Sequence, residues 1–313
     1  MAKLNIYSTQ PLESTKAQST ATGIGVVAIV LWSSLALLTK FSGNIPPFQL
    51  LFLSFFIAFL SSLAILFKRG RASFRLWRQS AQVWAFKFAA IFFYHALYFF
   101  ALQSAPPAEA SLLAYLWPLL IVIFSIFVER KTFQPKHLVG AALGFGGCAV
   151  AILGQSVPLS GTWNYGGYAA ALLCALVWSG YSVINRRYAD VPSEIMGGVC
   201  GLVALAALPI HLMTESTVFP TISQWISVML LGVGPTGLAF FAWDYATKHG
   251  RLSTIGALSY LSPLFSTLLL IAAGWTAPHW AIVVATLLIV VGAVIATLDR
   301  KRFPFGQANR NGV

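Results

Sequence analysis

The stretch AYLWPLL at residues 114–120 recurs 145 positions later as SYLSPLF at residues 259–265. Four residues are the same in both copies: Tyr115 and Tyr260, Leu116 and Leu261, Pro118 and Pro263, and Leu119 and Leu264. Shared leucines alone are weak evidence of a relation between two apolar segments, but a Tyr-Leu-x-Pro match in the same register is more specific. The match indicates that the chain contains an internal repeat.

Further matches extend outward from this stretch. The same shift of 145 positions aligns Ala101 with Ala246, Gly147 with Gly292, and Ala151 with Ala296. A shift of 146 aligns Trp32-Ser33 with Trp178-Ser179. The first copy is therefore predicted to cover residues 21–154 and the second residues 165–298.

The composition places both copies in a membrane. Of the 313 residues, 58% are hydrophobic and 9% are charged, whereas a soluble domain carries roughly 25% charged residues. The apolar residues come in long blocks, which excludes a single water-soluble core. The net charge of +12 does not indicate nucleic-acid binding, because the basic residues cluster in short gaps between the blocks, as topology signals do.

The apolar blocks have the length of transmembrane helices. A helix needs about 20 apolar residues to cross a bilayer, and an isolated strand would leave its backbone amides unpaired in lipid. Ten spans are predicted, at residues 21–39, 48–67, 83–103, 107–128, 137–154, 165–185, 194–213, 223–246, 252–273 and 279–298. The predicted fold class is an all-α membrane protein with ten transmembrane helices. Because five is odd, the second copy enters the membrane upside down, which gives the inverted-topology repeat typical of alternating-access transporters.

The basic residues predict the orientation. Eighteen of the 20 Lys and Arg residues lie on one side of the predicted spans, Lys40 lies on the other, and Lys87 lies just inside the third span. This bias predicts that the segment 1–20 and the tail 299–313 are cytoplasmic, in a multi-pass protein of a bacterial-type inner membrane. Residues 1–20 contain no apolar block, so no cleavable signal peptide is expected.

Two five-helix repeats, each with a Pro inside its fourth helix and a Gly-rich fifth helix, resemble the drug/metabolite transporter superfamily and its EamA-type branch. Within that branch, the aromatic-rich stretches FFYHALYFFALQSAP (92–106) and AYLWPLL (114–120) resemble the YddG-like aromatic amino-acid exporters. The resemblance implies a central cavity between the two halves. It also implies export of small amino-acid-like metabolites from the cytoplasm, with aromatic amino acids as the expected substrates.

The third predicted helix carries Tyr94, His95 and Tyr98. Tyr94 and Tyr98 are four residues apart and share a helix face, with His95 beside them. A polar group at mid-membrane is costly unless it faces protein or water, so this face is expected to look into the bundle. Two interpretations of His95 remain open: a packed residue bonded to a neighbouring helix, or a cavity residue that hydrogen-bonds the substrate.

Pro118 and Pro263 are predicted to kink the fourth and ninth helices. Proline has no amide donor, so the carbonyl four residues earlier loses its helical partner; these carbonyls belong to Ala114 and Ser259. Such a carbonyl could bind a substrate ammonium group. It could equally bond a serine or a water while the proline only bends the helix.

Bulky aromatic residues recur at equivalent positions of the two copies: Trp32 and Trp178, Tyr98 and Trp243, and Tyr115 and Tyr260. Rings retained in both halves are expected to line the shared axis. There they would stack on a flat apolar substrate or attract a quaternary ammonium group through cation–π interactions. The predicted substrate site has nine members: Trp32, Tyr94, His95, Tyr98, Tyr115, Trp117, Trp178, Trp243 and Tyr260.

The inverted repeat also predicts the depths of these rings. Tyr98 and Tyr115 fall in the outer halves of their helices, whereas Trp243 and Tyr260 fall toward the cytoplasm. The first pair is expected to narrow the outer mouth and the second pair the inner one. A structure open to the outside should therefore have the second pair packed closed.

Asp244 lies in the eighth predicted helix, four residues before Lys248. The simplest interpretation is an i,i+4 ion pair at the membrane interface. The alternative is a carboxylate that couples transport to protons.

The fifth helix contains Gly140-x-x-x-Gly144, followed by Gly146-Gly147. Small residues at this spacing predict that another helix approaches closely. The pattern does not distinguish a helix of the same chain from one of a second copy, so it leaves the oligomeric state open.

Motifs for metals, cofactors and catalysis are missing from the sequence. It has neither an HExxH motif nor a Gly-rich phosphate loop, and Cys148, Cys174 and Cys200 lie inside apolar blocks without metal-ligand spacing. No metal and no organic cofactor are expected, and the protein is not expected to be an enzyme. The expected partners are the lipid bilayer and a small zwitterionic, aromatic substrate.

Three alternatives to an amino-acid exporter are weaker. A multidrug exporter of quaternary ammonium cations usually needs a buried acid, and Asp244 looks too shallow for that. A phosphorylated-sugar exchanger would need a basic pair in the cavity, but Lys40 and Lys87 lie near opposite faces. A non-transporting membrane scaffold or an intramembrane enzyme does not explain the inverted repeat.

Overall fold

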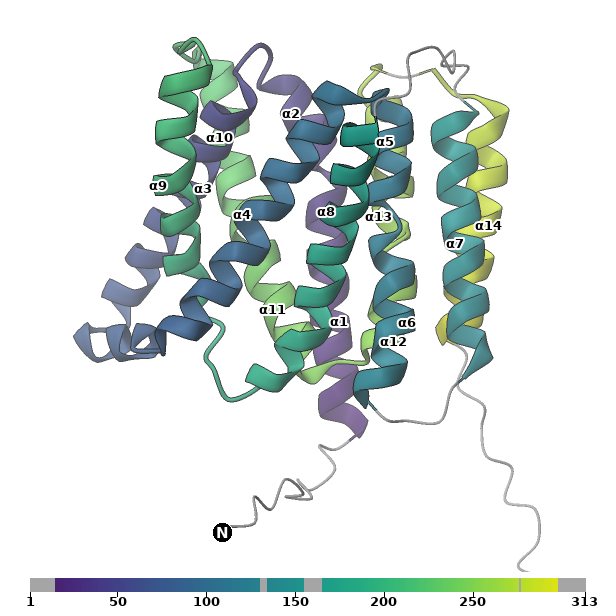
Figure 1. Cartoon of the computed structure of the whole chain (residues 1–313), viewed down its shortest axis with the longest axis horizontal. Coiled ribbons are helices and arrows are strands. Elements are labelled where there is room, and N and C mark those ends of the chain that lie inside the picture. The colour runs from purple at the N-terminus through teal and green to yellow at the C-terminus, as the bar shows by residue number, and fades with distance from the viewer. Residues whose placement is uncertain (1–14, 130–133, 155–164, 276, 298–313) are drawn as a thin grey trace, which may run out of the picture.

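A computed structural model describes residues 15–129, 134–154, 165–275 and 277–297. The described residues are helical and contain no strand (Figure 1). Ten of their segments are long and apolar enough to cross a membrane: Lys16–Phe41, Pro47–Lys68, Ala81–Ser104, Glu109–Phe127, Pro135–Leu153, Tyr165–Tyr188, Ile195–Thr214, Ile222–His249, Leu252–Ala272 and Trp280–Thr297. The prediction of ten transmembrane helices is confirmed.

Each half of the chain supplies five of these spans, and several spans consist of two helices. The first half contains α1 (Thr15–Ser33), α2 (Leu35–Phe41), α3 (Pro47–Lys68), α4 (Ala81–Ser104), α5 (Pro107–Ala114), α6 (Trp117–Glu129) and α7 (Pro135–Leu153). The second half contains α8 (Tyr165–Ile184), α9 (Ile195–Thr214), α10 (Ile222–Val233), α11 (Ala239–His249), α12 (Leu252–Leu258), α13 (Leu261–Ala272) and α14 (Trp280–Thr297). A π-helical turn, Gly234–Leu238, joins α10 to α11.

The contacts between helices have the symmetry of an inverted repeat. The most extensive contacts join α3 to α9 and α7 to α14, which are equivalent helices of the two halves. The contact of α4 with α8 has its counterpart in the contact of α11 with α1, and that of α6 with α8 in that of α13 with α1. Exchanging the two halves therefore reproduces the same set of neighbours.

The fourth and ninth spans are interrupted at equivalent positions. α5 gives way to α6 at Tyr115, and α12 gives way to α13 at Ser259, so Pro118 and Pro263 lie in the first turns of α6 and α13 instead of kinking a continuous helix. Proline fits the first turn because the amide it lacks has no helical partner there. The Ser259 carbonyl, which loses its i+4 partner to Pro263, accepts the amide of Ser262 at 3.1 Å.

Several helices begin where a side chain satisfies their first amides. The Ser80 hydroxyl accepts the amide of Val83 at the start of α4. At the start of α3, the carboxylate of Glu215 accepts the amides of Phe48 and Gln49 at 2.9 and 3.0 Å. The first four amides of a helix lack intrahelical partners. Here Glu215, at the end of α9 in the second half, accepts two of these amides at the start of α3 in the first half.

The glycine face of the fifth span packs against helices of the same chain. A Cβ atom on Gly140 would lie 2.5 Å from the carbonyl oxygen of Gly292 on α14, and one on Gly144 would lie 2.5 Å from the Tyr260 ring. A Cβ atom on Gly146 would meet nothing within 4 Å. The close approach predicted for Gly140 and Gly144 is confirmed, and its partners are α14 and Tyr260.

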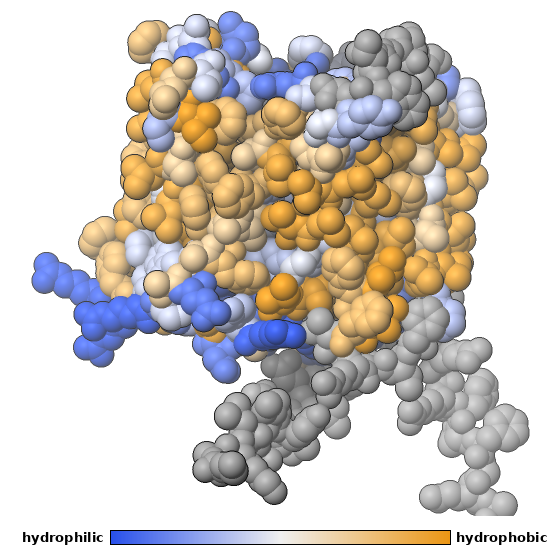
Figure 2. Space-filling model, in the orientation of Figure 1, coloured by the Kyte–Doolittle hydropathy of each residue, from blue (hydrophilic) through white to orange (hydrophobic). Residues whose placement is uncertain are grey.

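The bundle has two polar edges with an apolar band between them (Figure 2). α1 begins and α14 ends at the same edge, the lower one in Figure 1, which we call the terminal edge; the other is the opposite edge. The end of α3 and the segment that follows it lie at the terminal edge (Figure 1), and their exposed basic residues are Lys68, Arg69, Arg71, Arg75 and Arg78.

Candidate functional site

Aromatic rings from both halves meet around Trp178 of α8. Its ring centroid lies 5.6 Å from that of Trp32, 5.3 Å from Tyr94, 6.5 Å from Trp117 and 6.0 Å from Trp243. These five residues come from α1, α4, α6, α8 and α11. We call them the central aromatic cluster.

The rings of the central aromatic cluster are held in mixed orientations. Trp178 and Trp243 are stacked with an interplanar angle of 21°, whereas Trp32 meets Trp178 edge-on at 73°. The Trp32 indole donates a hydrogen bond of 3.0 Å to the carbonyl of Pro235 in the π-helical turn. That turn therefore fixes one ring of the cluster across the interface between the halves.

His95 lies at the edge of the central aromatic cluster. Its ring meets those of Tyr94 and Phe55 edge-on, with centroids 5.3 Å away in each case. Its Nδ1 lies 2.7 Å from the carbonyl oxygen of Ile91. Because a carbonyl only accepts, Nδ1 carries the proton in this contact, which leaves Nε2 of the neutral ring as an acceptor.

Tyr98 continues the aromatic face of α4 toward the opposite edge. Its ring stacks on that of Tyr94, with centroids 6.2 Å apart and an interplanar angle of 14°. Its hydroxyl lies 3.2 Å from the Ser111 hydroxyl on α5. Tyr94, His95 and Tyr98 are all half-buried, so this face of α4 is more accessible than the buried Trp178.

Tyr115 and Tyr260 belong to a neighbouring cluster between α7 and the interrupted helices. The Tyr260 hydroxyl donates to the backbone carbonyl of Tyr115 at 3.2 Å, and its ring lies 6.4 Å from that of Phe145. The two interrupted helices are thus bonded to each other. The structure joins seven of the nine predicted residues through ring contacts and pairs the remaining two here.

A second group of side chains, which we call the lysine–aspartate cluster, lies toward the terminal edge. Lys87 of α4 forms a salt bridge with Asp244 of α11, and both side chains are 0% exposed. Lys248 contacts the other carboxylate oxygen at 2.5 Å. Asn185 accepts from Lys87 at 2.8 Å and donates to Asp244 at 3.1 Å, and Tyr181 donates to Asp244 at 3.1 Å.

This cluster corrects one part of the sequence interpretation. The i,i+4 ion pair of Asp244 and Lys248 is present, but both side chains are fully buried in the protein, which the sequence interpretation did not predict. Lys87 adds a second positive charge to this pair from another helix. The signal was present in the sequence, since a lysine inside an apolar span requires a partner.

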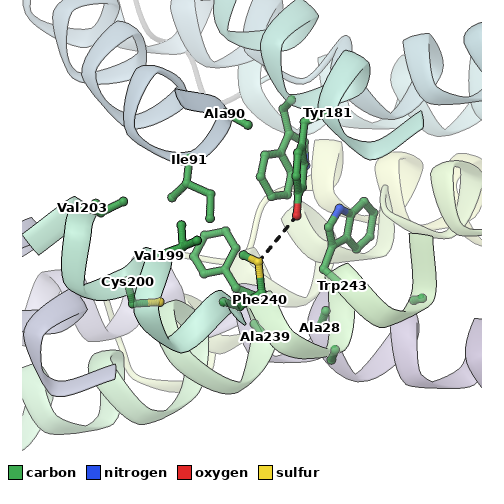
Figure 3. Close-up of a cluster of buried hydrophobic side chains, with 14 of the residues drawn as sticks. Ala28, Ala90, Ile91, Tyr181, Val199, Cys200, Val203, Ala239, Phe240 and Trp243 are labelled. Atoms are coloured by element: carbon green, nitrogen blue, oxygen red, sulfur yellow. Dashed lines mark hydrogen bonds between the residues drawn. The ribbon is translucent and has the colours of Figure 1, made fainter. Parts of the chain in front are cut away.

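Two residues connect the lysine–aspartate cluster with the central aromatic cluster. The Tyr181 ring lies 5.3 Å from that of Trp178, while its hydroxyl bonds Asp244. Trp243 precedes Asp244 and donates to the Ser182 hydroxyl at 3.1 Å. Figure 3 shows the Tyr181 hydroxyl directed toward the helix that carries Trp243, close also to the Met196 sulfur at 3.8 Å.

Sequence reasoning missed several neighbours of the rings. Phe240 lies 5.7 Å from Trp32 and 5.8 Å from Trp178, and Phe55 lies 5.6 Å from Phe240. Phe240 and Trp243 are three residues apart, as are Trp178 and Tyr181, so that a helical pattern marks each pair as sharing a face. Within the described parts of the chain, no three His, Cys, Asp or Glu residues are grouped to hold a metal ion.

Two inverted five-helix repeats, interrupted helices and an aromatic cluster at the interface of the halves define a membrane transporter of the inverted-repeat class. The comparisons with known proteins agree with this class. The chain belongs to the EamA-like transporter family, which matches residues 20–153 and 165–298.

Named relatives and a solved structure resemble the chain over most of its length. The aromatic amino acid exporter YddG of Ancylobacter novellus is 44% identical, over 91% of this chain and 100% of its own. The aromatic amino acid exporter YddG of Salmonella typhimurium is 24% identical, over 90% of this chain and 98% of its own. A crystal structure of a 44% identical protein has a TM-score of 0.85 and covers 90% of this chain and 97% of that protein.

Proposed function

We propose that the protein exports aromatic amino acids by alternating access, with the central aromatic cluster as the substrate site. The observation that carries this proposal is the set of rings from both halves around Trp178. A planar side chain gains from offset and edge-on contacts with such rings. The exporter from Ancylobacter novellus, at 44% identity, supports the same substrate class.

The charges beside the rings favour a zwitterion over a cation. Each residue of the central aromatic cluster is uncharged, and the neighbouring carboxylate of Asp244 already contacts two lysines. A quaternary ammonium compound would therefore meet an excess of positive charge below the rings. This arrangement disfavours the alternative of a multidrug cation exporter.

The orientation belongs to the same proposal: the terminal edge faces the cytoplasm of a bacterial-type inner membrane. The exposed basic residues after α3 at that edge support it. Trp243 of the predicted inner pair is 0% exposed, and Tyr260, also 0% exposed, contacts Tyr115 and so lies at the depth of that residue. Tyr98 and Tyr115, the predicted outer pair, are half-buried. These differences fit a conformation that is closed toward the cytoplasm and accessible from outside.

Transport by purified protein in proteoliposomes tests the substrate class. Labelled Phe and Trp should exchange across the membrane, whereas a quaternary ammonium dye should not. The assay is run with and without a proton gradient, which decides whether transport is coupled. A protein that moves the dye and ignores both amino acids would instead be the cation exporter.

Cysteine labelling in whole cells tests the orientation and the depths of the rings. The three native cysteines, Cys148, Cys174 and Cys200, are buried and are replaced first. Tyr98→Cys and Tyr115→Cys should then react with a membrane-impermeant reagent added outside, and Trp243→Cys should be shielded. Reaction of the Trp243→Cys variant from outside contradicts the proposed orientation.

A further inference from the structure

The charges of the lysine–aspartate cluster do not balance. Lys87 and Lys248 contribute two positive charges and Asp244 contributes one negative charge, with all three side chains fully buried. Among the described residues, the other polar partners of these side chains are neutral: Asn185, Tyr181, the Ser193 hydroxyl and the carbonyl of Val191. An excess charge in a buried site is costly. A second anion bound to the cluster would neutralise this charge and stabilise it.

The two lysines differ in how strongly the fold keeps each of them in contact with Asp244. Asp244 and Lys248 are four residues apart on α11, so their contact survives any motion that leaves α11 helical. Lys87 reaches Asp244 from α4, 157 residues away in the chain and in the other half of the repeat. Opening of the terminal edge, which moves one half against the other, separates Lys87 and leaves Lys248 paired.

Lys87 lies on the same face of α4 as the substrate site. Lys87 and Tyr94 are seven residues apart, which is two helical turns or about 10 Å. Both meet α8: the Lys87 ammonium lies 5.7 Å from the centre of the Tyr181 ring, and the Tyr94 ring lies 5.3 Å from that of Trp178. The face thus carries a cation at one end and stacking rings at the other.

We propose that Lys87 binds the substrate's carboxylate when the terminal edge is open, and that Asp244 displaces this carboxylate as the edge closes. The proposal rests on the export of aromatic amino acids proposed above. Lys87 then has one anionic partner in each conformation. Closure transfers the substrate from Lys87 to the uncharged rings around Trp178, from which it leaves on the other side.

The exchange also explains how uncharged rings select an amino acid. The rings around Trp178 carry no charged group that would pair with the carboxylate by which tryptophan differs from tryptamine. Lys87 makes that distinction before the substrate reaches the rings, because an ammonium forms its strongest hydrogen bonds with anions. Compounds with a net positive charge are rejected at the same point.

A substrate panel on Lys87→Met tests the proposal, with tryptophan and tryptamine as the pair. The variant keeps a balanced Lys248–Asp244 pair, so folded protein is expected, and its yield is checked by size-exclusion chromatography. Transport of tryptophan should fall about 10- to 100-fold, as expected for loss of a hydrogen bond to a charged group. The preference for tryptophan over tryptamine should disappear, and Lys87→Arg should restore it.

Two further variants separate this role from a structural one. Lys248→Met leaves Lys87 in place and should keep the preference for tryptophan. Asp244→Asn removes the competing anion, so both KM and kcat for tryptophan should fall, because the substrate is held more tightly and released more slowly. Wild-type transport of tryptophan with an unchanged preference in Lys87→Met overturns the carboxylate site alone. Wild-type protein that transports no aromatic amino acid overturns the proposed function as well.

Discussion

The two ends of α4 are held in place by different chemistry. Near the terminal edge, the Lys87 side chain is fully buried, forms a salt bridge with Asp244 and donates a hydrogen bond to Asn185. Toward the opposite edge, Tyr94 and Tyr98 are half-buried, and the Tyr98 hydroxyl contacts a neutral group, the hydroxyl of Ser111. One helix thus passes from a charged, sealed end to an accessible aromatic one.

The difference teaches that closure is not equally strong at the two ends. Charge-assisted hydrogen bonds are about twice as strong as neutral ones, and low dielectric surroundings strengthen them further. A buried carboxylate with four donors is therefore a far firmer closure than a pair of stacked tyrosines. Mutations at the two ends measure this difference.

The largest effect is expected from Asp244→Ala, which leaves Lys87 and Lys248 buried without an anion. Removal of one partner from a buried ion pair costs about 3–5 kcal/mol of stability. The control is Glu194→Ala, because Glu194 pairs with Arg69 at 3.0 Å with side chains 33% and 56% exposed. An exposed pair contributes about 0–1 kcal/mol. The midpoint of thermal unfolding in detergent gives both values, and equal losses would show that burial of the cluster does not matter.

A smaller effect is expected from removing one hydroxyl at each end. Tyr181→Phe deletes a donor to the charged Asp244, which should cost about 1.5–3 kcal/mol, and Tyr98→Phe deletes a neutral contact with Ser111, which should cost about 0.5–1.5 kcal/mol. Both substitutions keep the aromatic ring, so ring contacts serve as an internal control. A larger loss for Tyr98→Phe than for Tyr181→Phe would reverse the proposed order of strength.

The sequence predicted the architecture because membrane insertion depends on local properties. Span length, the positions of basic residues and a repeated Tyr-Leu-x-Pro stretch can each be read without knowing which helices touch. The aromatic rings around Trp178 were predicted for a related reason. For Trp32, Trp178 and Trp243, recurrence of an aromatic residue in the other half marks positions near the axis that the halves share, whereas Tyr94 and Trp117 were predicted from their places in the third and fourth helices.

The contact of Lys87 with Asp244 was not predicted, because it joins two residues with no local relation. Lys87 and Asp244 lie on helices of different halves, and nothing in either segment indicates which helix face meets which. Tyr115 and Tyr260 are equivalent in the repeat, and they contact each other through a hydroxyl and a backbone carbonyl, as residues near a shared axis can. Their packing beside α7 was not predicted, because no local pattern indicates it.

The packing of α7 against α14 has a consequence for the order of synthesis. α7 begins at Pro135 and its partner α14 begins at Trp280, 145 residues later. At about 5–20 residues per second, a ribosome needs roughly 7–30 s to cover that distance. During this interval Gly140 and its neighbours present a bare backbone surface in the bilayer, with no Cβ to block other helices. α14 covers this surface, so a protein truncated before α14 would leave the glycine face of α7 uncovered.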